Sequence, residues 1–124
     1  MTTWITVCDS CKRENWAETA QSETDGERFA AMVEAAVQEV TGVETRRHSC
    51  LMGCARACNV AIQGDGKLNY TLGAFDPTQE VADAVVEYAR LHATSDTGQV
   101  PYRNWPQAIK GHFVTRHPPL PSTD

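Results

Sequence analysis

Residues 59–72, NVAIQGDGKLNYTL, are the stretch that decides the fold. Every second residue from Leu68 to Leu72 is apolar, which is the pattern of a strand that buries one face. Gly64-Asp65-Gly66 separates this run from the apolar run before it, and an Asp-Gly pair is a strong signal for a hairpin turn. The sequence therefore predicts two antiparallel strands, over 59–63 and 67–72.

Two further strands and a helix are predicted upstream of this hairpin. Trp4–Val7 is short, aromatic and β-branched, as strands are, and Val43–His48 is a more polar candidate for a second strand. Between them lies a stretch, 27–41, in which apolar residues recur at helical spacing. Gly42 follows it as a helix stop. The order up to the hairpin is therefore strand, helix, strand.

A second helix is predicted after the hairpin, over Asp76–His92. Asp76 would be its N-cap residue and Pro77 its first helical residue, because Pro is well tolerated at that position. Strands and helices in this order predict an α/β fold, a small domain with a mixed sheet flanked by helices.

The domain is expected to occupy residues 1–116. Within it, residues 94–116 are predicted to be an irregular extension that includes a short helix over 106–114. Residues 117–124, HPPLPSTD, form a Pro-rich tail that we expect to be flexible. The length of 124 residues fits one such domain.

Composition and charge exclude several classes of function. The net charge of −5 disfavours nucleic-acid binding, since phosphate contacts need a basic face. No apolar run approaches the length of a membrane span, and the N-terminus lacks the pattern of a signal peptide. The expected location is therefore the cytoplasm, where clustered cysteines more often bind metal or do redox chemistry than form disulfides.

The strongest chemical signal is a set of cysteines in two short clusters. They are Cys8, Cys11, Cys50, Cys54 and Cys58. The first pair follows one predicted strand and the second pair follows another. Strand ends of an α/β sheet converge on one rim, so the two pairs could surround one point. Four thiolates suit either Zn²⁺ or an iron–sulfur cluster, and spacing alone does not decide between them.

The segment CLMGCARACNVAIQGDGKLNYTLGAFDPTQEVADAVVEY, residues 50–88, resembles the C-terminal half of the thioredoxin-like [2Fe–2S] ferredoxins. Cys50 and Cys54 match their second cysteine pair, Asp65-Gly66 matches their hairpin turn, and Cys8 matches the other half in order. The resemblance implies a thioredoxin-like fold and a [2Fe–2S] cluster held by four cysteines.

The ligands expected from these observations are Cys8, Cys11, Cys50 and Cys54. The chain departs from the ferredoxins at two points: only two residues separate Cys8 from Cys11, and Cys58 is an additional cysteine. Cys58 is therefore either a thiol near the site or a ligand in place of Cys54 or Cys11. A helix over 50–58 would align all three of its cysteines on one face.

Three functions remain open at this stage. The first is electron transfer: a cluster protein that serves a redox partner enzyme, is not itself an enzyme, and could form a homodimer as proteins of this fold often do. The second is binding or delivery of Zn²⁺ or Co²⁺. With its CxxC, its CxxxCxxxC and its Trp105-Pro106 segment, the whole chain also resembles a family of small bacterial proteins described only as predicted metal-binding, some of them linked to cobalamin synthesis. In this function Cys58 would suit ligand exchange.

The third function is thiol–disulfide exchange at Cys8-Asp-Ser-Cys11, which follows a strand as such motifs do. It is the weakest of the three, because these enzymes place a cis-proline opposite the motif and no proline precedes Pro77.

Charged and aromatic residues near the cysteines give secondary expectations. Three arginines flank the second cluster and could offset the charge of a cluster or dock a partner: Arg46, Arg47 and Arg56. His48 could replace a cysteine on one iron. Three other histidines are expected at the surface or at helix ends: His92, His112 and His117. Trp4 is expected in the core or covering it.

Overall fold

The computed structural model describes residues 2–10, 12, 22–49, 51 and 58–121. Its strands and helices are β1 (Thr3–Cys8), α1 (Asp25–Val37), β2 (Val43–His48), β3 (Val60–Gly64), β4 (Asn69–Leu72), α2 (Gln79–Thr94) and β5 (Phe113–His117), with 3-10 turns η3 (Tyr102–Asn104) and η4 (Gln107–Ile109) before the last strand. The strands form one sheet in the order β2-β1-β3-β4-β5. Strand β1 runs parallel to β2, and the other neighbours are antiparallel.

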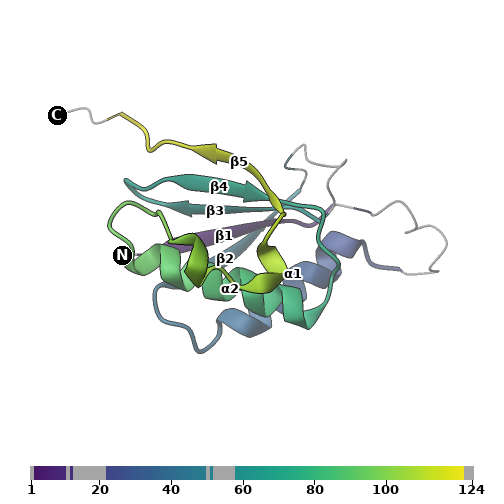
Figure 1. Ribbon diagram of the computed structural model, residues 1–124. Helices are drawn as coiled ribbons and strands as arrows, with labels where there is room; N and C mark the ends of the chain where they lie inside the picture. Colours follow the sequence, from purple (N-terminus) through teal and green to yellow (C-terminus); the bar gives the residue numbers. More distant parts are fainter. Residues whose placement is uncertain (1, 11, 13–21, 50, 52–57, 122–124) are drawn as a thin grey trace.

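Both helices lie on the same side of the sheet and pack against each other (Figure 1). The buried residues of the hairpin face them, among them Ile62, Tyr70 and Leu72, together with Phe29 and Val33 of α1. The predicted α/β fold with a mixed sheet is confirmed, and it is consistent with a thioredoxin-like arrangement. Within the described ranges, no helix is both long and apolar enough to span a membrane.

The start of α2 differs from the prediction because a different residue caps it. Thr78 has an extended backbone, and its hydroxyl accepts the N–H of Val81, so Thr78 is the N-cap residue. Asp76 and Pro77 precede the cap instead of forming the first turn. Helix α1 begins with a full capping box, in which Thr24 and Glu27 satisfy each other's backbone N–H groups.

The C-terminal stretch contains a strand that the sequence did not predict. Residues 113–117 form β5, which pairs antiparallel with β4 at the edge of the sheet. The helix expected over 106–114 is reduced to the single 3-10 turn η4. The expected irregular extension therefore ends in regular structure, and His117 belongs to the sheet.

A buried polar network ties the end of α2 to the start of β1. His92 lies in the last turn of α2, as expected, but it is fully buried. Its Nε2 donates to the carbonyl of Leu68 at 2.7 Å, and its Nδ1 lies 2.8 Å from the hydroxyl of Thr3. Lys67 is also buried, and its Nζ donates to the carbonyls of His92 and Ala93 at 2.9 and 2.7 Å. Lys67 thereby adds a charged donor to the carbonyl end of α2, where the carbonyl of His92 also accepts the N–H of Ser95.

This network predicts a pH dependence of stability. Burial lowers the pKa of His92, so the folded protein keeps the ring neutral at pH values where the unfolded chain, with a pKa of about 6.5, binds a proton. The stabilisation is thus present above that pH and is lost as the pH falls toward the folded pKa. We expect the free energy of unfolding in urea to decrease from about pH 7 to about pH 5, and to decrease less in His92→Gln.

The same substitution at the exposed His117 is the control, because His117→Gln removes an imidazole that lies outside the buried network. Two carboxylates in hydrogen-bonded pairs titrate below their ordinary range. The pKa of Glu27 is lowered by its hydrogen bonds to Thr24, and that of Glu34 by its hydrogen bond to Arg47. Equal slopes in wild type and His92→Gln would show that His92 does not carry the effect.

Candidate cysteine site

Cys8 is the last residue of β1 and is completely buried. Its backbone N–H donates to the carbonyl of Asn59, just before β3, at 3.1 Å. The N–H of the next residue, Asp9, donates to the carbonyl of His48, the last residue of β2, at 3.2 Å. The ends of β1 and β2 and the start of β3 therefore meet at one edge of the molecule, which we call the cysteine rim.

The sulfur of Cys8 accepts a backbone N–H from the segment that follows β2. The donor is Leu51, with its nitrogen 3.4 Å from Cys8 Sγ, and the hydroxyl of Ser10 lies 3.6 Å from the same sulfur. Leu51 directly follows Cys50 in the chain, so the two cysteine segments approach each other here. Hydrogen bonds to sulfur are a common feature of thiolate ligands and tune the metal they hold. The chemistry around Cys8 fits a ligand of a metal or cluster.

Cys58 lies in a different environment. It is fully buried within the hydrophobic core cluster that also contains Phe75 and Val60. Its backbone N–H donates to the carbonyl of Phe75 at 3.4 Å. A cysteine packed among apolar side chains behaves as a small hydrophobic residue. The surroundings of Cys58 thus match the expected near-site thiol more closely than those of a ligand.

The other predicted ligands, Cys11, Cys50 and Cys54, lie outside the described residues, and so does Arg56. In the part of the chain that the structure describes, no group of three or more His, Cys, Asp or Glu could hold a metal ion. His48 is exposed and pairs with Cys8 across the two strands. The described part of the rim therefore supplies one buried sulfur whose surroundings fit a ligand.

The first turn of α1 supports the rim from the helix side. The hydroxyl of Thr24 donates to the carbonyl of Asp9. Gly26 packs so closely on the end of β1 that a Cβ added there would lie 2.1 Å from the carbonyl oxygen of Cys8. Only glycine fits this contact without displacing the backbone beside Cys8.

Two of the three arginines that flank the second cysteine cluster are described, and they have separate roles. Arg47 makes a double ion pair with Glu34 of α1, with both N–O distances 2.8 Å, and this contact raises the pKa of Arg47. Arg46 lies on the face of the sheet opposite α1 and α2, which among the described residues carries no helix and which we call the helix-free face. There its Nε donates to Thr6 Oγ1 at 2.7 Å and its Nη2 to Gln63 Oε1 at 3.2 Å. Arg46 therefore presents its charge at the surface, while Arg47 fastens β2 to α1.

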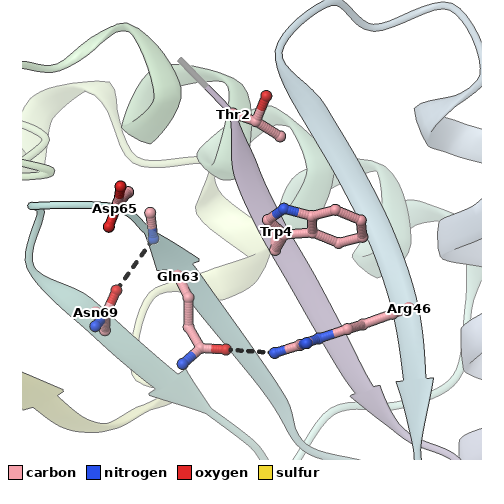
Figure 2. A pocket seen from close by; sticks show the side chains of 7 residues that line it. Thr2, Trp4, Arg46, Gln63, Asp65 and Asn69 are labelled. Atoms are coloured by element: carbon pink, nitrogen blue, oxygen red, sulfur yellow. Dashed lines mark hydrogen bonds between the residues drawn. The ribbon is translucent and has the colours of Figure 1, made fainter.

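The helix-free face also carries a hollow of about 560 Å³. Figure 2 shows it between β2, β1 and the hairpin, with Arg46 and Trp4 side by side. The expectation that Trp4 is in the core or covers it is wrong: its side chain points away from the helices and is 41% exposed. The guanidinium carbon of Arg46 lies 5.9 Å from the centre of the indole ring. This face thus offers an exposed aromatic ring next to a fixed positive charge.

The hollow and Cys8 share one face of β1, because side chains alternate along a strand and Trp4, Thr6 and Cys8 are spaced by two. Four residues of strand correspond to about 13 Å. The surface around Trp4 is thus adjacent to the cysteine rim without being part of it. No feature of the sequence marked Trp4 as exposed, since a short aromatic strand reads as buried.

Comparison with protein families finds a match over residues 5–119 to a family described as protein of unknown function (DUF1636). The chain belongs to this family. The match includes all five cysteines and extends through β5, so the C-terminal strand is part of the family's domain. Comparison with curated proteins and with solved structures finds no match. Membership in a small family without known function is therefore established.

The contact at Gly26 gives a prediction about the support of the rim. In an ordinary helix Gly→Ala stabilises by about 1 kcal/mol. At this position the new methyl group would meet the carbonyl of Cys8, and such overpacking costs about 1–3 kcal/mol. The cost is equal to or larger than the gain, so we expect Gly26→Ala to lower the free energy of unfolding by up to about 2 kcal/mol in urea titrations.

Ala35 is the matched control, because it is exposed on the same helix. Ala35→Gly should destabilise by about 1 kcal/mol, following ordinary helix propensity. If Gly26→Ala instead raised the free energy of unfolding while Ala35→Gly lowered it, the steric contact with β1 would be contradicted.

Proposed function

We propose that this protein is an electron-transfer protein in which Cys8, Cys11, Cys50 and Cys54 bind a [2Fe–2S] cluster, as in the thioredoxin-like ferredoxins. The hydrogen bond from Leu51 to the buried sulfur of Cys8 carries the proposal. It brings the segment with the second cysteine pair to the end of the strand that leads into the first pair. The sheet order and the two helices on one face support the same comparison.

Two pairs of cysteines on two neighbouring segments match the need of a [2Fe–2S] cluster, in which each iron takes two thiolates. When bound, such a cluster supplies one-electron transfer. The protein's part is to fix the ligands, exclude water from the sulfurs and provide N–H donors. The complete burial of Cys8 and the N–H of Leu51 meet the last two of these requirements at one ligand.

The position of Cys58 supports its role as an additional thiol. In the apolar core a cysteine packs as a small hydrophobic residue. Zinc or cobalt binding, the alternative function, would use the same four ligands and differs only in the metal found.

The partner of such a carrier would be another redox protein. The exposed indole of Trp4 and the guanidinium of Arg46 lie on the same face as Cys8 and support docking there. Aromatic and arginine side chains are enriched at protein interfaces. An acidic patch on the partner would complement Arg46.

The test is an anaerobic purification with the visible spectrum, iron, acid-labile sulfide and zinc measured on one sample. We expect about two irons and two sulfides per chain. Cys8→Ser should lose the cluster or shift its absorption, because the ligand is replaced. The matched variant Cys58→Ser should keep the iron and sulfide content of the wild type.

Loss of the cluster in Cys58→Ser but not in Cys54→Ser would make Cys58 a ligand and overturn the assignment. A colourless protein with about one zinc and no sulfide would replace electron transfer by metal binding. A protein without metal, before and after reconstitution with iron and sulfide, would contradict both functions.

A further inference from the structure

Of the four large apolar side chains that are exposed in the described residues, three lie at the C-terminal edge of the sheet and the fourth is Trp4. Large apolar side chains that are exposed include Tyr102 at 63%, Val114 at 36% and Leu120 at 90%. All three belong to β5 or to the segments just before and after it. Exposed apolar groups that gather in one place commonly mark a contact with another molecule.

A groove of about 440 Å³ lies beside β5. One wall is the strand itself, from Phe113 to Arg116, and the other is the segment 99–105. Aromatic rings form its floor: Trp105 stacks on Phe113 with ring centres 4.4 Å apart, and Tyr102 lies 4.9 Å from Trp105. The indole N–H of Trp105 donates to the carbonyl of Val100 at 2.9 Å, which fixes the ring in place.

An aromatic groove of this kind is the type of surface that binds proline-rich segments. Such segments adopt the extended polyproline conformation in advance, so little entropy is lost when they bind between aromatic rings. The chain carries such a segment itself, Pro-Pro-Leu-Pro at 118–121, and the described part of it is exposed. Its central Leu120 is the most exposed of the large apolar side chains.

We propose that this groove binds the proline-rich tail of a second copy of the chain, so that two copies exchange tails. Within one copy, the tail leaves β5 at His117, which is at the opposite end of the strand from Phe113. From there it continues away from the body of that copy (Figure 1). A second copy aligned antiparallel along the edge of β5 runs in the other direction. Its tail would pass the Phe113 end of the strand, where Tyr102 and Trp105 lie.

The edge strand and the charges suit this arrangement. Among the described strands β5 is the last in the sheet order, so no described strand pairs with one side of its backbone, which can pair with a second β5. The charged side chain in the groove is Arg116, and Lys110 lies over the Tyr102 ring at 4.7 Å. The tail instead carries Asp124 after its prolines. Because the partner's tail passes the Phe113 end of β5, the cation on its path is Lys110 beside Tyr102, and Arg116 lies at the other end of the strand.

The experiment measures mass in solution as a function of concentration, by sedimentation equilibrium on the full chain. We expect a monomer–dimer equilibrium in the wild type. Leu120→Ser and Tyr102→Ser should each weaken the dimer by about tenfold or more, because each removes a large apolar contact. Both side chains are exposed within one copy, so neither variant should unfold it.

Trp4→Ser is the matched control, since Trp4 is an exposed aromatic residue on the helix-free face and should leave the dimer unchanged. A synthetic peptide of residues 117–124 should compete with the dimer and change the fluorescence of Trp105. A wild type that stays monomeric at all concentrations would overturn the proposal. A dimer that resists both Leu120→Ser and Tyr102→Ser would also overturn it.

Discussion

The structure depends on the position of β1 between β2 and β3. Its parallel pairing with β2 brings the two strand ends together, and its antiparallel pairing with β3 brings the start of β3 to the same place. The backbone bonds from Cys8 to Asn59 and from Asp9 to His48 fix this meeting point. A slip of β1 by one residue would turn Cys8 to the other face of the sheet. The chemistry proposed for the rim therefore rests on one strand register.

The other end of β1 is held by a separate set of hydrogen bonds. Thr3 bonds to the buried His92, and Lys67 satisfies the carbonyl end of α2 beside it. At the cysteine end, Gly26 and Thr24 bring the first turn of α1 onto Cys8 and Asp9. Support at both ends leaves β1 little freedom to move. A metal or redox site gains from such support, because its ligands keep their geometry when charge changes.

Much of this fold could be predicted from the sequence because local signals agreed with tertiary packing. The Asp-Gly turn and its alternating flanks predicted the hairpin, and Val43–His48 was predicted with the bounds observed. Strand β5 was missed, since Thr115, Arg116 and His117 are polar and nothing in their own pattern indicates a strand. Its pairing with β4 comes from an edge that only the folded sheet provides.

The candidate site, too, could be predicted from the sequence only in part. Clusters of cysteines are visible in the sequence, and so is the proximity of strand ends in an α/β fold. The ferredoxin resemblance set Cys58 apart from the four expected ligands, but the different surroundings of Cys8 and Cys58 are not visible in the sequence. One sulfur receives an N–H from a neighbouring loop, whereas the other packs in the core. Similarly, the burial of Lys67 depends on carbonyls more than twenty residues away in the chain.

The two edges of the sheet differ in a way that relates the two proposals to each other. The edge at β2 carries Glu44, Arg46 and Arg47, and charged edges resist pairing with another sheet. The edge at β5 carries one arginine, Arg116, beside the exposed Val114, and it leads into the exposed proline-rich tail. Strand β5 lies three strand spacings from β1, which corresponds to about 14 Å. Exchange of tails at β5 would therefore leave the cysteine rim and the face around Trp4 open, so that a dimer could still meet a redox partner at each rim.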